Sequence, residues 1–227
     1  MRRILLSFGF LLATASLLSA QPATGVVGTV HDLSSTGLRK VTAAQSVCVF
    51  CHAIHGNAVT NQLIPNWNHT TTATTFQMYN SSFSQTLKGA VDAQPTGPSL
   101  ACLSCHDGTV AMGALFEVPA GGGHSNYTTA QGGINPTTGR MVGANVVGPN
   151  LTGEHPISIT YRDDLNTKLK AASAITGVKL YPTNATGSKV QCASCHDVHN
   201  YGVTGTTAPF LRVSMANSAL CVACHKM

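Results

Sequence analysis

Four short cysteine and histidine motifs constrain this chain more than any other feature of its sequence. Each motif has two cysteines three positions apart, followed directly by a histidine, and together the motifs use all eight cysteines. Because histidine is only 10 of 227 residues, finding it by chance after all four pairs has a probability of roughly a few in a million. The motifs are Cys48-Val-Phe-Cys51-His52, Cys102-Leu-Ser-Cys105-His106, Cys192-Ala-Ser-Cys195-His196 and Cys221-Val-Ala-Cys224-His225.

This motif predicts covalent attachment of haem. Two thiols three residues apart lie on one side of a helical turn, where both can add to the vinyl groups of one porphyrin. The histidine that follows is then placed to bind the iron as the proximal ligand. The sequence therefore predicts four covalently bound c-type haems, with all eight cysteines as attachment points and with proximal ligands His52, His106, His196 and His225.

Two other kinds of site use paired cysteines. Four Cys-x-x-Cys units could form two zinc ribbons, and eight cysteines in an exported chain could form four disulfides. Neither site requires a histidine directly after every second cysteine. The pattern therefore favours haem over both alternatives.

The first 20 residues are typical of a secretory signal peptide. Two arginines follow Met1, residues 4–18 are uncharged and mostly apolar, and Ser19-Ala20 ends the run with small residues. We expect cleavage after Ala20 and export of one tetrahaem domain, residues 21–227. Export agrees with the cysteine motifs, because thioether-linked haem is assembled outside the cytoplasm. No later segment is apolar for long enough to be a transmembrane segment.

The composition of the mature chain limits both its partners and its fold. Loss of two arginines leaves 11 basic and 8 acidic residues, a formal charge of +3 that is too small to indicate nucleic acid or an anionic membrane as a partner. Only 9% of residues are charged, 22 are glycine, and aromatic residues are few. We therefore expect a mostly irregular multihaem cytochrome c fold, with short helices at the haem motifs, a few short strands, and haems that form the core.

Few segments outside the motifs have a regular pattern. Residues 26–30 read as a short strand or extended segment, and residues 155–161 alternate as a strand does. Residues 162–175 have early aspartates and later lysines, which predicts a helix. We also expect a helix over residues 42–54 and a short helical piece from about Met215.

Six histidines remain after the proximal ligands are assigned, enough to fill four distal positions. A haem with histidine on both faces has no open site for a substrate and can only pass electrons. Two candidates repeat the same offset of three residues from a proximal histidine, and two lie at the start of ordered segments. The expected distal ligands are His31, His55, His155 and His199. His69 is the next candidate and His124 follows, and their roles stay open at this point.

These segments together resemble the exported tetrahaem cytochromes of metal-reducing bacteria. They are similar in particular to the OmcE type, whose subunits polymerise into extracellular cytochrome nanowires. The resemblance covers essentially all of the mature chain and rests on the four motifs, on His31-Asp-Leu-Ser and on His155-Pro-Ile-Ser. It implies four bis-histidine haems stacked in a continuous line. It also implies that a neighbouring subunit can donate one distal histidine, for which His31 is the first candidate.

The sequence thus predicts an electron-transfer protein and no enzyme. We expect a subunit of an extracellular cytochrome filament, a homopolymer that exchanges electrons with other multihaem cytochromes and extracellular acceptors. The alternatives are a monomeric periplasmic shuttle with the same chemistry, and a multihaem reductase of a small inorganic substrate. The reductase requires one haem with an open face. The motifs alone do not distinguish filament from monomer, and they do not identify the terminal acceptor.

Overall fold

Short elements joined by turns make up the chain in a computed structural model, which describes residues 25–34, 37, 46–53, 64, 66–117, 133–182, 188–200 and 210–227. The expected signal peptide lies outside these residues, as do His55 and His124. Within the described part, regular structure is limited to three α-helices, two 3-10 turns and one three-stranded sheet. Turns, bends and isolated bridges connect these elements.

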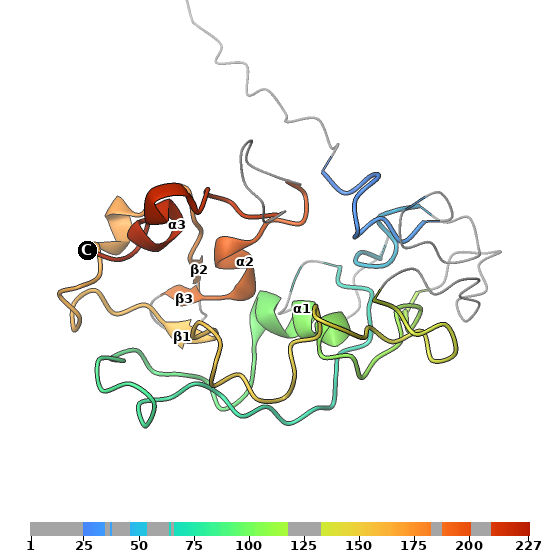
Figure 1. Cartoon of the computed structure of the whole chain (residues 1–227), viewed down its shortest axis with the longest axis horizontal. Helices are drawn as coiled ribbons and strands as arrows, with labels where there is room; N and C mark the ends of the chain where they lie inside the picture. Colours follow the sequence, from blue (N-terminus) through green and yellow to red (C-terminus); the bar gives the residue numbers. More distant parts are fainter. Residues whose placement is uncertain are drawn as a thin grey trace, which may run out of the picture.

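The longest element is helix α1, Gly97–His106, which carries the second motif and lies near the middle of the molecule (Figure 1). Pro98 lies in its first turn, where the backbone has no intrahelical acceptor to lose. The helix ends before Gly108, which has a φ of +71°. Leu103 on the buried side of α1 belongs to a small apolar core with Phe76, Met78 and Leu151.

A small antiparallel sheet holds the segment that leads to the third motif. Its strands are β1, Ile159–Thr160, β2, Tyr181–Pro182, and β3, Ser188–Val190, in the order β1-β3-β2. Strand β3 is central and leads almost directly to helix α2, Cys192–Cys195. The sheet therefore fixes the third motif relative to the chain that follows His155.

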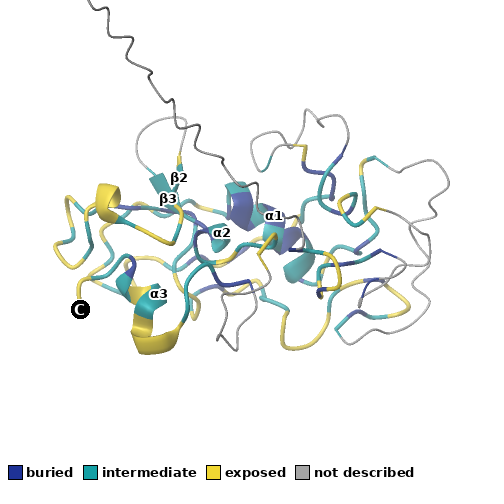
Figure 2. Cartoon of the chain, turned by 90° about the horizontal axis from the view of Figure 1, so that it is seen from above, coloured by how far each residue is buried: buried dark blue, intermediate teal, exposed yellow. Residues whose placement is uncertain are grey.

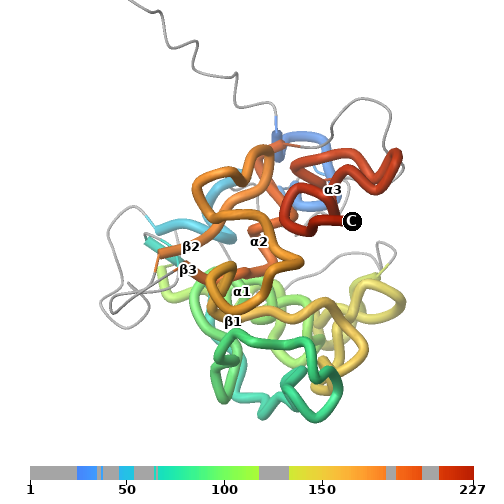
Figure 3. Tube along the Cα trace, turned by 90° about the vertical axis from the view of Figure 1, so that its left-hand side faces the viewer, coloured from blue at the N-terminus to red at the C-terminus, as the bar shows by residue number. Residues whose placement is uncertain are grey.

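The fourth motif lies on the last elements of the chain. The 3-10 turn η2, Ala216–Ser218, continues into α3, Ala219–Val222, at the end of the molecule that also carries the C terminus (Figures 1 and 3). Along the long axis of Figure 1, α3, α2 and α1 follow one another, and the segment 46–53 lies beyond them. Figure 2 shows several buried residues along α1, whereas α3 is half-buried with one exposed residue, Cys221.

Several expectations about secondary structure were only partly right. Short helices do occur at the second, third and fourth motifs, but residues 46–53 form turns in place of the expected helix. The expected strand over residues 155–161 is limited to Ile159–Thr160. Ser158, with a φ of 52°, interrupts the extended backbone before it. Residues 26–30 form turns, because the Thr29 N–H and hydroxyl both donate to the Val26 carbonyl, at 3.1 and 2.7 Å.

The helix expected over residues 162–175 was wrong. Only the 3-10 turn η1, Ala172–Ala174, is helical there. The Arg162 guanidinium bonds the carboxylate of Asp164 two residues away, and the Asn166 side chain accepts the Lys168 N–H at 3.0 Å. Such local bonds from Asp and Asn side chains compete with the helix. Leu165 is 51% exposed and does not pack against a core that would compensate.

Candidate haem centres

Each motif forms a single turn that brings its histidine back over its first cysteine. In the second motif this turn is part of α1. In the other three, the histidine N–H donates to the carbonyl of the first cysteine of the motif. The N···O distances are 2.8 Å for His52, 3.1 Å for His196 and 2.9 Å for His225. The two thiols and the histidine therefore leave the same turn, as attachment of one haem requires.

Polar side chains join the second motif to the third. Gln191 caps helix α2, and its backbone N–H donates to the Ser194 hydroxyl at 2.9 Å. The Ser99 hydroxyl of α1 donates to Gln191 Oε1 at 2.5 Å and accepts the Cys192 N–H at 2.9 Å. A hydrogen bond between the Cys102 and Cys192 thiols raises the pKa of Cys102 and lowers that of Cys192. The two attachment sites are thus in direct contact.

Burial raises the pKa of other motif thiols. It raises the pKa of Cys51 to about 11 and that of Cys105 to about 12. All eight cysteines are free, with no disulfide between them. In the part of the chain that the structure describes, no three His, Cys, Asp or Glu side chains are grouped as ligands of a metal ion would be.

Three of the expected distal histidines lie opposite a proximal histidine from another part of the chain. Two imidazoles that bind one iron from opposite faces have ring centroids roughly 6 Å apart, because each metal–nitrogen bond is about 2 Å long. The observed separations have this size. They are 6.1 Å for His31 and His106, 6.2 Å for His52 and His199, and 6.4 Å for His155 and His225.

Backbone carbonyls orient two of these rings. His106 Nδ1 lies 2.9 Å from the Asn145 carbonyl, and His155 Nδ1 lies 3.1 Å from the Pro156 carbonyl. A ring that donates through Nδ1 keeps the lone pair of Nε2 for a metal. Burial is the main reason why the pKa of His155 lies below its ordinary value. The neutral imidazole is the form that binds iron.

His31 fits an iron ligand for an additional reason. Burial, followed by the nearby His106 and His196, lowers its pKa from 6.5 to about 4. Its ring packs edge-on against Phe210, with centroids 4.6 Å apart. Its Nδ1 is buried and has no hydrogen-bond partner in the structure. Buried polar atoms nearly always have a partner, so this Nδ1 is an exception among the described residues. The lowered pKa keeps the imidazole neutral, which is the form that can bind haem iron beside His106.

The third motif differs from the other three. Among the histidines that the structure describes, none has its ring paired with that of His196 in this way. Burial, followed by the charge of His106, lowers the pKa of His196. The expected ligand His55 and the further candidate His124 lie outside the described residues. The geometry therefore leaves the distal partner of His196 open.

His69 is buried, and backbone carbonyls contact both of its ring nitrogens. It is 1% exposed, and its two ring nitrogens each lie 2.9 Å from a backbone carbonyl, one of Thr70 and one of Ala111. Both nitrogens are therefore engaged within the protein. His69 lies 3.6 Å from the Cys105 sulfur rather than opposite a proximal histidine. Its neighbour Asn68 is equally buried and bonds the backbone of the first motif at Val49.

Two aspartates directly after proximal histidines also belong to the site, and the sequence analysis gave them no role. Asp107 accepts the Thr109 N–H and the Thr74 hydroxyl, each at 2.8 Å, and a further bond from Thr72. Burial alone would raise the pKa of Asp107, but these donors hold it below its ordinary value. Asp197 pairs with Arg212 at 2.8 Å. The signal was the repeated order Cys-His-Asp in the second and third motifs.

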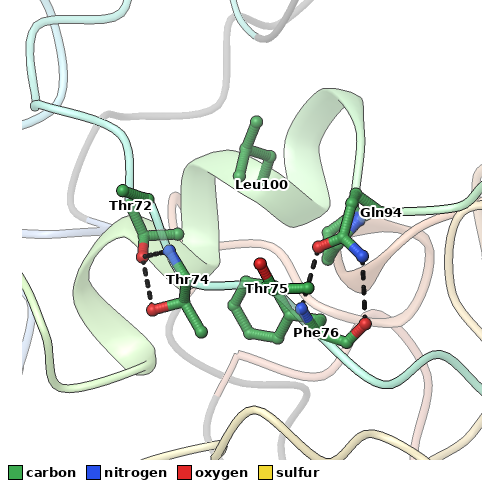
Figure 4. A pocket seen from close by; sticks show the side chains of 8 residues that line it. Thr72, Thr74, Thr75, Phe76, Gln94 and Leu100 are labelled. Atoms are coloured by element: carbon green, nitrogen blue, oxygen red, sulfur yellow. Dashed lines mark hydrogen bonds between the residues drawn. The ribbon is translucent and has the colours of Figure 1, made fainter.

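A shallow cleft of about 350 Å³ lies beside α1 (Figure 4), and no cysteine is among the residues that line it. Leu100 lines it, and a residue two positions before Cys102 points to another side of the helix. The Gln94 side-chain oxygen accepts the Phe76 N–H at 2.8 Å, and its amide nitrogen donates to the Phe76 carbonyl at 3.0 Å. The polar groups of the cleft therefore bond one another, and we assign no cofactor to it.

The chain matches no protein-family model, and no curated protein is significantly similar to it. None of the helices in the described ranges is long and apolar enough to cross a membrane.

Proposed function

We propose that this protein transfers electrons through four c-type haems, each attached to one Cys-x-x-Cys-His motif and ligated by histidine on both faces. The observation that carries the proposal is the pairing of three proximal histidines with three distal ones at 6.1 to 6.4 Å. The pairs join segments that are far apart in the sequence, so the local motifs alone do not produce them.

The residues of the chain would hold and enclose the cofactor. When bound, haem supplies an iron that cycles between ferric and ferrous states. The cysteines would fix each porphyrin by two thioethers, and each histidine pair would close both faces to substrates. Ligation by two imidazoles, without the methionine found in other cytochromes, favours low potentials. The hydrogen bonds to Asn145 and Pro156 hold His106 and His155 in the tautomer that binds iron through Nε2.

The positions of the motifs support a conduit along the molecule. The elements that carry them follow one another along the long axis (Figure 1), and the second and third motifs are in contact through Ser99 and Gln191. We infer that electrons pass from porphyrin to neighbouring porphyrin in this order. We further propose that the protein is exported and forms a homopolymer. In it, other multihaem cytochromes would be donors and extracellular acceptors would receive the electrons.

The second candidate function is reduction of a small inorganic substrate at the third haem. The observation that favours it is the lack of a paired ring for His196 among the described histidines. If this iron has an open face in the assembled protein, a substrate could bind there. His55, His124 or a histidine of a neighbouring subunit would close that face and leave only electron transfer.

Spectroscopy and imaging of the exported protein test these proposals together. Mass spectrometry should show four thioether-bound haems per chain, and electron paramagnetic resonance should show low-spin ferric iron only. Reduced protein should not bind carbon monoxide. Fewer than four haems would refute the proposed function, whereas one carbon monoxide per chain would favour the reductase. Electron microscopy of the secreted fraction then separates a filament from a monomeric shuttle.

A further inference from the structure

The residue that follows the proximal histidine differs in charge among the four motifs. It is Ala53 in the first, Asp107 in the second, Asp197 in the third and Lys226 in the fourth. In every motif this residue directly follows the proposed iron ligand. The same position would therefore place a different charge near each of the four haems.

Asp107 is a buried carboxylate that only uncharged groups satisfy. It is 6% exposed, and both of its oxygens accept hydrogen bonds. The donors are the Thr109 N–H at 2.8 Å, the Thr109 hydroxyl at 2.8 and 2.9 Å, the Thr74 hydroxyl at 2.8 Å and the Thr72 hydroxyl. A carboxylate that only accepts is ionised. No lysine or arginine among the described residues forms an ion pair with it.

The other three positions lack an uncompensated buried charge. Asp197 forms an ion pair with Arg212, with 2.8 Å between Oδ2 and Nη1, so its charge is locally neutralised. Ala53 has no charge. Lys226 is exposed, and water screens its charge. The second motif is therefore the one of the four where a fixed negative charge acts on the haem from this position.

We propose that Asp107 lowers the reduction potential of the haem at the second motif and makes it the lowest of the four. The inference rests on the proposed function. A ferric haem carries one more positive charge than a ferrous one, and a buried carboxylate nearby stabilises the ferric form because little solvent screens it. Asp107 directly follows the proximal ligand His106 in the sequence. An electron that moves along the four haems would thus have its highest free energy on the haem of the second motif.

The test is a reductive titration of the exported protein with Asp107→Asn, followed by optical and paramagnetic resonance spectra. The amide keeps the shape of the side chain and removes its charge. The lowest of the four reduction potentials should rise by about 59 mV. This shift corresponds to an equilibrium constant for that one-electron reduction that is about tenfold larger. If that step does not move, the proposal is wrong.

Thr74→Val is the matched control. It removes one hydrogen bond to Asp107 and leaves the carboxylate in place. If Asp107 only fastened residues 72–74 to α1, both variants would shift the step alike, and that result would overturn the proposal. We expect the lowest step to keep its potential, within a twofold change, in Thr74→Val.

A second variant tests the same reasoning at the third motif and does not depend on the folding of Asp107→Asn. Arg212→Gln removes the cation that neutralises Asp197. The reduction potential of one of the other three haems should therefore fall toward the lowest one. No downward shift would contradict the electrostatic account. Haem content is measured first in each sample. Fewer than four haems in the unmodified protein would refute the proposed function, whereas four haems with unmoved potentials would refute only this inference.

Discussion

Removal of the His155 side chain tests the ligand assignment most directly. Its ring centroid lies 6.4 Å from that of His225, and its Nδ1 lies 3.1 Å from the Pro156 carbonyl. His155→Ala would leave the haem of the fourth motif attached through Cys221 and Cys224, because neither thioether depends on the distal ligand. It would open one face of one iron.

The size of the effect follows from the number of motifs. One iron in four would change from low spin to high spin, so the high-spin ferric signal should account for about a quarter of the haem. After reduction, the variant should bind one carbon monoxide per chain, where the unmodified protein binds none. Added imidazole should restore the low-spin spectrum, because the open space has the shape of the missing ring.

His69→Gln is the control for this experiment. His69 is 1% exposed and both of its nitrogens contact backbone carbonyls, so its loss should affect stability without opening an iron. Carbon monoxide binding should stay at zero in this variant. If His155→Ala keeps a fully low-spin spectrum, or if His69→Gln binds carbon monoxide instead, the assignment of distal ligands from ring geometry is wrong.

Three further predictions concern stability and are measured by denaturant unfolding. The buried Tyr161 hydroxyl donates to the Lys170 carbonyl at 2.8 Å, with the Cys224 carbonyl 3.2 Å away, and burial raises its pKa from 10.0 to about 12. Its contribution should therefore be complete below pH 10 and disappear as the pH rises through 12. Tyr161→Phe should cost about 1 kcal/mol at pH 7 and show a smaller alkaline loss. Asn68→Ala should cost about 2–4 kcal/mol, because it removes three buried hydrogen bonds, two of them to the Glu117 backbone. Gly108→Ala should cost about 1–3 kcal/mol, because a side chain at a φ of +71° is strained and its Cβ would lie 2.9 Å from the Met141 carbonyl oxygen. If the denaturant midpoint of any of these variants is unchanged, the contact proposed for that residue does not stabilise the fold.

The end of the molecule that carries the fourth motif would be a contact surface in the proposed assembly. Helix α3 has no buried residues, and Met215 and Met227 are 50% and 83% exposed. An exposed haem edge at one end of a line of haems is where electrons would enter or leave. A filament would cover this end, so hydrogen exchange near α3 should slow on assembly.

The sequence by itself determined the chemistry that is local to one turn. The spacing within each motif fixes two thiols and one histidine on the same turn, and no distant residue is needed for that arrangement. The helices at the second, third and fourth motifs follow the same local rule. The helix expected over residues 162–175 failed for a related reason. Side-chain bonds between near neighbours such as Arg162 and Asp164 outweighed a charge pattern that had no apolar face behind it.

The tertiary structure decided which histidines meet. His52 and His199 are 147 residues apart (199 − 52), and the first motif lies between His31 and His106, yet the ring centroids of each pair are no more than 6.2 Å apart. It also separated His69, whose nitrogens are engaged by carbonyls, from the ligand candidates. Such pairings depend on loops whose direction is set by many weak contacts at once. A sequence pattern records a ligand when its partner lies within one turn, whereas a partner brought from far along the chain leaves no regular spacing to read.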